Sequence, residues 1–272
     1  PHGAGWRMSA ALDHARMEIG IDGVELGLTS LQRDGEGDPI LFLHGFGSTK
    51  EDFADIQRHA GLDRHGVIAY DAPGFGDSHC SDHGRVDIPF LAKTALAMLD
   101  HAGIDRFHLV GHSMGGLTAL MLASAYPERV LSFCNIEGNI APEDCFLSRQ
   151  IHDFPADDDQ AFMEAFIERT RHAPAWSSPL YASRLAHMVN PAVVRGICTT
   201  MVDLSDNAGL MERFLELPCP KMFMYGEQNA TLSYLGHIGR HGVELAEIPQ
   251  CGHFPMYANP PAMWGRISDF LR

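Results

Sequence analysis

Residues 109–116 read LVGHSMGG. An apolar run over 107–110 ends at Gly111, a helical pattern begins at Gly115, and Ser113 stands between them. These residues match G-x-S-x-G, which in a strand–turn–helix context predicts a serine held clear of the backbone in a tight turn. Glycine on either side leaves room for the strand and the helix to approach each other. We therefore expect the turn to expose Ser113 as a nucleophile; the alternative is a glycine-rich turn with an incidental serine.

Short apolar runs on both sides of this turn predict the strands of a mainly parallel sheet, because strands covered on both faces are continuously apolar. The runs are 40–45, 66–71, 107–111, 130–138, 221–226 and 243–248. A hairpin is predicted around Asp22-Gly23, between MEIGI and VELGLTSL. Helical patterns alternate with the runs, notably at 88–101, 115–125 and after Pro260. The predicted fold class is therefore α/β, a doubly wound sheet flanked by helices.

Residues 139–217 interrupt this alternation. The segment has helical patterns but no convincing strand; the patterns cover 160–170, 181–189, 192–202 and 208–215. About eighty strandless residues between two core strands predict a helical insertion that acts as a cap or lid. The core would then comprise residues 1–138 and 218–272. Ordinary crossover helices are the alternative, which the length of the segment disfavours.

Composition limits the classes of partner. The chain has 272 residues, of which 45% are hydrophobic and 20% charged, with a formal net charge of −15. This charge disfavours nucleic acid and anionic membrane surfaces as partners, and no stretch of 18 apolar residues predicts a membrane span. The first seven residues, PHGAGWR, lack the apolar core of a signal peptide and read as a cloning remnant outside the fold. A monomer and a homodimer are both compatible with the sequence.

Cysteine and histidine usage bears on location and metals. None of the six cysteines forms a C-x-x-C pair, so we interpret them as reduced thiols of a cytoplasmic protein. The sixteen histidines are scattered without an H-E-x-x-H spacing, which predicts no metal site.

A serine nucleophile needs a base and an oxyanion hole. His253 lies in PQCGHFPMYANPP, after the last predicted strand, where a neutral imidazole could take the serine proton and return it to the leaving group. The backbone N–H of Met114, at the start of the helix, can face the developing oxyanion. A second donor is expected from HGFG after the strand at 40–45, and we assign it to the N–H of Phe46. His44 is expected to be structural or to line this loop.

The motifs HGFGS, DAPGFGDS, GHSMGG and GHFPMYANP, in this order, resemble those of the α/β-hydrolase family from Met17 onward. The resemblance implies an eight-stranded, mostly parallel sheet, a cap inserted after the sixth strand, and no cofactor. It also implies a serine–acid–histidine triad. By position, Ser113 is the nucleophile and His253 the base, and the amides of Phe46 and Met114 form the oxyanion hole.

The triad acid departs from the family pattern. The usual position after the seventh strand holds Asn229, which cannot stabilise an imidazolium as a carboxylate does. Glu137 ends the sixth predicted strand, 24 residues after Ser113. Some branches of the family, including haloalkane dehalogenases and certain lactonases, resemble this arrangement. Glu137 is therefore our hypothesis for the acid, with Glu227 and Asp144 as the alternatives.

These residues predict a serine hydrolase that cleaves a carboxylic ester or lactone through an acyl-enzyme. Carbon–carbon hydrolysis, amide hydrolysis and acyl transfer use the same groups and remain open. The alternative from another class, favoured by Asn229, is a protein that binds a small molecule without turning it over. Apolar side chains of the insertion predict a small to medium, largely apolar substrate. The candidate pocket residues are His44, Phe162, Met163, Phe166, Trp176, Tyr181, Met188 and Met201.

Overall fold

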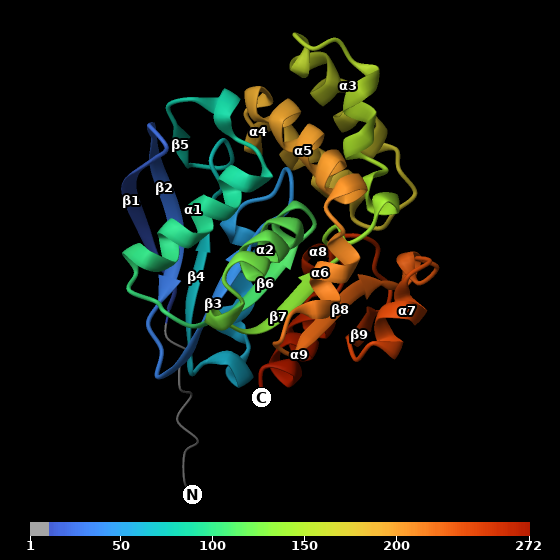
Figure 1. The fold of residues 1–272 in the computed structure, drawn as a ribbon. Helices are drawn as coiled ribbons and strands as arrows, with labels where there is room; N and C mark the ends of the chain where they lie inside the picture. Colours follow the sequence, from blue (N-terminus) through green and yellow to red (C-terminus); the bar gives the residue numbers. More distant parts are fainter. Residues whose placement is uncertain (1–10) are drawn as a thin grey trace, which may run out of the picture.

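The computed structural model describes residues 11–272, and the prediction about residues 1–7 lies outside them. Nine strands in this part of the chain form one sheet (Figure 1). They are β1 (Asp13–Ile21), β2 (Val24–Arg33), β3 (Gly37–Leu43), β4 (His65–Tyr70), β5 (His79–Cys80), β6 (Phe107–His112), β7 (Val130–Ile136), β8 (Lys221–Gly226) and β9 (Glu244–Ile248). The spatial order is β1-β2-β4-β3-β6-β7-β8-β9, with β5 paired to β2. Strands β3, β4 and β6 to β9 are parallel.

The predicted eight long strands are present, and the prediction missed β5, whose two residues carry no periodic signal. The hairpin β1–β2 turns at Asp22 and Gly23, which have φ angles of 50° and 81°. Two successive positive φ angles are typical of a type I′ turn, which matches the right-handed twist of the strands. All six residues of β4 are buried, as the unbroken apolar run predicts.

Nine α-helices flank or follow the strands in the described residues. They are α1 (Ile88–His101), α2 (Met114–Ala125), α3 (Asp159–Arg171), α4 (Ser178–Met188), α5 (Val194–Asn207), α6 (Leu210–Glu216), α7 (Leu235–Arg240), α8 (Pro255–Ala258) and α9 (Pro260–Phe270). Side-chain caps start several of them: Asp87 accepts from Phe90 N–H at 2.8 Å, and Asp158 accepts from Ala161 N–H at 2.9 Å. On the sheet, Phe42 of β3 packs against Trp264 of α9 at 5.8 Å between ring centroids. No helix within residues 11–272 is both long and apolar enough to cross a membrane.

The segment 139–217 between β7 and β8 contains helices α3 to α6 and no strand. In Figure 1, α3, α4 and α5 lie together beyond the sheet, whereas α6 lies over β8. Phe214 of α6 contacts Phe133 of β7 with 5.7 Å between ring centroids, so α6 also serves as a covering helix of the sheet. The division of the chain at residues 139 and 217 remains a prediction.

The sheet order places a topological switch point at β3. The chain passes from β3 to its neighbour β4 and then returns to β6 on the other side of β3. In open α/β sheets, ligands bind at the carboxyl ends of strands at such a point. Phe46 follows β3 and Ser113 follows β6, so both candidate residues lie at this edge.

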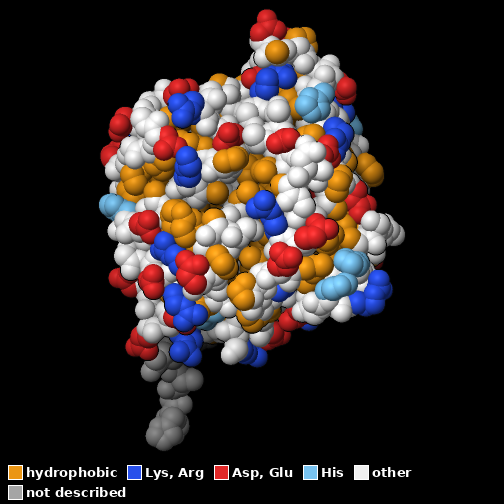
Figure 2. All heavy atoms as spheres, viewed as in Figure 1, with side chains coloured by type: hydrophobic (Ala, Val, Ile, Leu, Met, Phe, Trp, Pro, Cys, Tyr) orange, Lys and Arg blue, Asp and Glu red, His pale blue; other side chains and the backbone are white. Residues whose placement is uncertain are grey.

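Figure 2 shows acidic and basic side chains interspersed with apolar ones on one face of the molecule. Lys and Arg side chains do not gather into a basic patch on this face of a chain whose net charge is −15. All six cysteine thiols are buried and free.

Candidate active site

The turn after β6 holds Ser113 in a strained conformation. Its φ of 52° and ψ of −119° lie outside the regions that non-glycine residues usually adopt. The Ser113 N–H donates to Ile136 O of β7 at 2.9 Å, which ties the turn to the neighbouring strand. A Cβ at Gly115 would lie 2.2 Å from Leu43 O, so the helix can approach β3 only with glycine there. The backbone thus carries the strain that exposure of Ser113 requires.

Sheet register brings Glu137 beside this turn. Ile136 pairs with His112 on one side and with Met224 of β8 on the other. The next residue along β7 is Glu137, which has a φ of 46° and donates its N–H to Met224 O at 3.0 Å. Ser113 and Glu137 therefore directly follow the ends of the adjacent strands β6 and β7, at the same edge of the sheet. Both residues have a positive φ.

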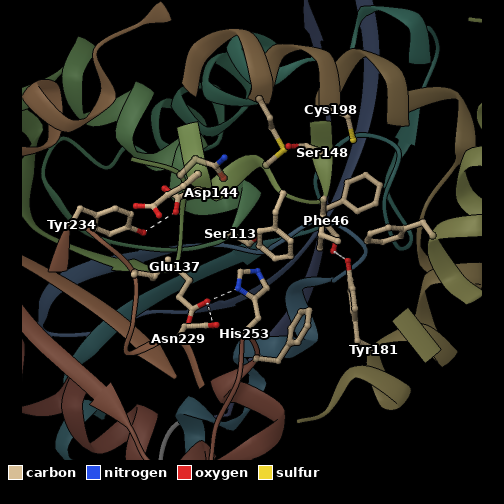
Figure 3. A pocket seen from close by; sticks show the side chains of 18 of the residues that line it. Phe46, Ser113, Glu137, Asp144, Ser148, Tyr181, Cys198, Asn229, Tyr234 and His253 are labelled. Carbon is tan, nitrogen blue, oxygen red and sulfur yellow. Dashed lines mark hydrogen bonds and ion pairs between the residues drawn. The ribbon is translucent and has the colours of Figure 1, made fainter. Parts of the chain in front are cut away.

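His253 contacts the Glu137 carboxylate directly (Figure 3). The distance from His253 Nδ1 to Glu137 Oε2 is 2.6 Å, and the two side chains are 20% and 6% exposed. Since an ionised carboxylate can only accept, Nδ1 carries the hydrogen and Nε2 is left as an acceptor. The alternative acid Glu227 instead accepts from Gln250 N–H at 2.8 Å, and Asp144 bonds Tyr234. Of the three candidates, the structure brings Glu137 to the histidine.

Asn229 supports this carboxylate. Its Nδ2 donates to Glu137 Oε1 at 3.0 Å and Oε2 at 2.8 Å, and Gly226 N–H donates to Oε1 at 2.7 Å. An aspartate at position 229 would put a second negative charge beside the first. The asparagine at position 229 is therefore matched to the carboxylate of Glu137, which directly follows β7.

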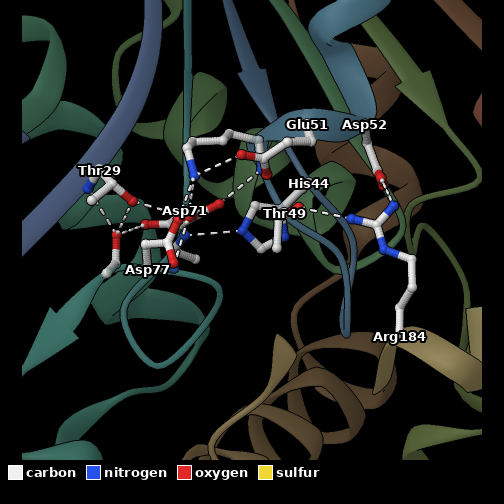
Figure 4. Close-up of polar contacts among 11 residues, drawn as sticks. Thr29, His44, Thr49, Glu51, Asp52, Asp71, Asp77 and Arg184 are labelled. Atoms are coloured by element: carbon white, nitrogen blue, oxygen red, sulfur yellow. Dashed lines mark hydrogen bonds and ion pairs between the residues drawn. The ribbon is translucent and has the colours of Figure 1, made fainter. Parts of the chain in front are cut away.

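His44 orients the loop after β3, in line with the expected structural role, and its role in substrate binding stays a prediction. Its Nε2 accepts from Ala72 N–H at 2.9 Å, which leaves Nδ1–H to donate to Gly45 O at 2.8 Å (Figure 4). Ser48 N–H donates to the same carbonyl at 3.1 Å. In a trans peptide the C=O and N–H groups point in opposite directions. Holding the Gly45 carbonyl therefore sets the direction of the Phe46 N–H.

A buried ion pair joins this loop to the one after β4. Lys50 Nζ lies 2.7 Å from Asp71 Oδ2, with side-chain exposures of 2% and 0% (Figure 4). Burial lowers the pKa of Lys50, but its hydrogen bonds and charge contacts with Asp71 and Glu51 outweigh burial, so the pKa is raised overall. The pair fixes the loops at the switch point.

His112, next to Ser113, is fully buried and holds the loop of His253. Its ring contacts the carbonyl oxygen of His253 through Nε2 at 2.8 Å, so Nε2 carries the hydrogen. Burial lowers the pKa of His112 well below its usual range, which keeps the ring neutral. His112 therefore anchors the backbone of His253 by a neutral hydrogen bond.

One cavity collects most of the predicted site. The predicted residues that line it are Phe46, Ser113, Glu137, Phe162, Phe166, Tyr181, Met201 and His253. Met114 begins α2 and is buried at 1% exposure. The structure places Met163 in the core, Trp176 at the surface with 42% exposure, and Met188 where its carbonyl accepts from Gly76 N–H at 3.0 Å. These three residues are not among those that line this cavity, and their role in substrate binding stays a prediction.

The sequence analysis did not place the other lining residues in a pocket. They are Asn139, Glu143, Asp144, Phe146, Leu147, Ser148, Cys198, Asn229, Leu232, Tyr234 and Phe254. Several belong to GNIAPEDCFLS, which directly follows Glu137, and proximity to a strand end at the switch point could have indicated them. Burial raises the pKa of Asp144 to about 6, although Tyr234 O–H and two backbone N–H groups donate to its carboxylate. In residues 11–272, no group of three or more His, Cys, Asp and Glu side chains is arranged to hold a metal ion.

Curated relatives match part of the chain. It is 34% identical over 120 residues to a pimeloyl-[acyl-carrier protein] methyl ester esterase of Aeromonas hydrophila, covering 44% of each protein. It is 39% identical over 103 residues to a 2-hydroxy-6-oxo-6-phenylhexa-2,4-dienoate hydrolase of Comamonas testosteroni, covering 35% of each. The chain thus spans less than half the length of these relatives.

Solved structures share the fold over nearly the whole chain. An E-2-(acetamidomethylene)succinate hydrolase superposes with a TM-score of 0.71 at 18% identity, covering 95% of this chain and 99% of that one. The enol-lactonase from Burkholderia xenovorans superposes with a TM-score of 0.69 at 20% identity, covering 94% and 99%. Residues 38–195 match the family described as the alpha/beta hydrolase fold. The chain, with its mostly parallel sheet flanked by helices, therefore belongs to the α/β-hydrolase family.

Proposed function

We propose that the chain is a serine hydrolase that cleaves a carboxylic ester or lactone of a small to medium, largely apolar substrate. Ser113 is the nucleophile, His253 the base and Glu137 the acid that orients and stabilises the imidazolium. The contact of His253 Nδ1 with Glu137 Oε2 at 2.6 Å, on the cavity that Ser113 also lines, carries the proposal. The names of the relatives, an esterase and an enol-lactonase, agree with this class of reaction.

In the first step, Ser113 Oγ attacks the substrate carbonyl carbon and its proton passes to His253 Nε2. The carbonyl π electrons move to the oxygen, and the N–H groups of Phe46 and Met114 stabilise this oxyanion. His44 holds the first of these amides, and the start of α2 supplies the second. Glu137 stabilises the positive charge on His253, and Asn229 keeps that carboxylate in place.

Collapse of the tetrahedral intermediate breaks the carbon–oxygen bond to the leaving group. The imidazolium of His253 gives its proton to the departing alkoxide, which leaves the acyl group on Ser113. Water then attacks the acyl-enzyme with His253 as base, and a second collapse releases the acid and restores the serine. In a lactone the alkoxide stays tethered to the acyl group, so a hydroxy acid is the single product.

Hydrolysis of p-nitrophenyl acetate and butyrate tests the proposal, with Ser113→Ala as the variant. We expect turnover by the unaltered chain and none above background by Ser113→Ala. A simple lactone, followed by acid release, tests the second substrate class. Equal rates for both proteins would refute Ser113 as nucleophile, and silence of both on every ester and lactone would favour the binding-protein alternative.

A further inference from the structure

The cavity has two chemically different ends, with the proposed nucleophile between them. In Figure 3, Phe46, Tyr181 and Cys198 lie to one side of Ser113, whereas Asp144 and Tyr234 lie to the other. The apolar side is a continuous aromatic wall. Its ring contacts are Phe46 with Phe166, Phe162 with Phe166, Phe166 with Tyr181, and Tyr181 with Phe254.

The opposite end is polar and negatively charged. Glu143 and Asp144 are adjacent in the 3₁₀ helix η5 (Pro142–Cys145), and both line the cavity. Asp144 accepts from Tyr234 O–H at 2.8 Å and from the backbone N–H of Ile140 at 2.8 Å, and Glu143 accepts from Ser233 O–H. These donors are neutral, so they leave the negative charge uncompensated.

The cavity walls do not offer a countercharge for an anionic ligand. Among the described residues that line the cavity, there is no Lys or Arg. A carboxylate on a ligand would meet Glu143 and Asp144 in a partly desolvated space, where like charges repel more strongly than in water. A cation would be attracted by the same field.

A buried hydroxyl in the cavity wall lacks a hydrogen-bond partner among the described residues. Ser148 lines the cavity and is 6% exposed, and its Oγ has no hydrogen-bond partner in the described structure. A buried polar group without a partner costs about 1–3 kcal/mol, which a polar group on a ligand would relieve. This observation is independent of the two carboxylates.

We propose that the cavity selects esters with an apolar part on the aromatic side and an ammonium or neutral hydrogen-bond donor on the Glu143–Asp144 side, and that it rejects esters carrying a carboxylate. The inference rests on the proposed hydrolase function and adds its substrate class. Phe46, Phe162 and Phe166 contact the apolar part. The carboxylates of η5 contact the polar part, and Ser148, which lies beside Cys198 (Figure 3), offers its hydroxyl to the ligand away from these carboxylates.

Two sets of matched esters test the charge preference by acid release in a pH-stat. The first set varies the alcohol of butyrate esters: choline, its neutral isostere 3,3-dimethylbutanol, and 4-hydroxybutanoate. The second varies the acyl group of p-nitrophenyl esters: 4-(trimethylammonio)butanoyl, 5,5-dimethylhexanoyl and the glutaric monoester. The two sets cover both orientations of the ester in the cavity. We expect kcat/KM for the cationic ester to exceed that for the anionic ester by at least about tenfold in one set.

Variants localise the preference to this end of the cavity. Glu143 is exposed, so Glu143→Lys places a cation there at little cost in folding; we expect it to lower the cation-to-anion ratio at least about fivefold. Glu143→Gln should lower the ratio less, in the same direction. Asp34→Lys makes the same charge change on an exposed residue before β3, at the opposite edge of the sheet, and should leave the ratio within about twofold.

The outcomes separate the two proposals. If the neutral esters are cleaved by the unaltered chain but not by Ser113→Ala, and the ratio is below about tenfold in both sets, the charge selection is refuted alone. A ratio that Glu143→Lys and Asp34→Lys change equally would also refute it. If no ester in either set is cleaved, or if Ser113→Ala cleaves them as fast as the unaltered chain does, the hydrolase function fails, and the substrate class with it.

Discussion

Replacing Glu137 by glutamine tests the acid most directly, because the neighbouring donors dictate how the amide must sit. Oε1 accepts from Gly226 N–H at 2.7 Å and from Asn229 Nδ2 at 3.0 Å, while Oε2 accepts from Asn229 at 2.8 Å and from His253. A glutamine has one oxygen. With that oxygen at Oε1 it accepts from Gly226 N–H and Asn229 Nδ2. The flipped amide would accept from Asn229 and His253 instead, but its NH₂ would face the Gly226 N–H, which would lose its acceptor.

The favoured orientation turns the amide NH₂ towards His253 Nδ1. Nδ1 must then accept, so the ring hydrogen moves to Nε2. A protonated Nε2 cannot accept the proton of the serine hydroxyl. A wrong tautomer of this kind in a serine–histidine–acid triad lowers kcat by about 10⁴, which corresponds to about 5.5 kcal/mol in the barrier. We expect that loss for Glu137→Gln on p-nitrophenyl butyrate, with the thermal unfolding midpoint almost unchanged.

The matched control is Glu227→Gln, which makes the same chemical change at the alternative acid, whose carboxylate bonds Gln250 N–H rather than His253. We expect the kcat of Glu227→Gln to stay within about twofold of the unaltered value, since no tautomer depends on it. A Glu137→Gln variant that keeps more than a tenth of the unaltered kcat, measured against a Ser113→Ala background, would refute the reasoning.

Three further predictions follow from the contacts of the site. Lys50→Met leaves Asp71 buried without its cation, so the free energy of unfolding should fall by about 3–5 kcal/mol; a urea titration that shows a loss below about 1 kcal/mol would contradict this. Asn229→Leu removes two hydrogen bonds to the Glu137 carboxylate, so kcat should fall by about tenfold to a hundredfold with KM unchanged; a rise in KM alone would instead indicate a substrate contact. Asp144 has its pKa raised from 3.8 to about 6, so the folded state binds the extra proton and stability falls as pH rises through this interval. Asp144→Asn can keep all three hydrogen bonds and should flatten that part of the curve of unfolding free energy against pH; an unchanged slope would show that another group causes it.

The sequence by itself determined the local features of this protein. Short-range steric and hydrogen-bonding rules act on a few consecutive residues, so Asp22-Gly23 indicated the hairpin and LVGHSMGG indicated the strained turn at Ser113. Unbroken apolar runs and helical periodicity located the eight long strands and the helices of the 139–217 segment. These predictions hold in the folded protein because they depend only on each segment's own backbone conformation and on which of its own faces is buried.

Only the tertiary structure decided which side chains meet. Glu137 and Glu227 are both acidic residues at strand ends, and the register of β6, β7 and β8 brings the first to His253 and leaves the second with Gln250. The apolar side chains of the insertion likewise make Phe166 and Trp176 equal candidates for the pocket, yet Phe166 lines the cavity and Trp176 lies at the surface. Such contacts join residues tens of positions apart, and a shift of one residue in strand pairing reverses the direction of every side chain, so no local pattern encodes them.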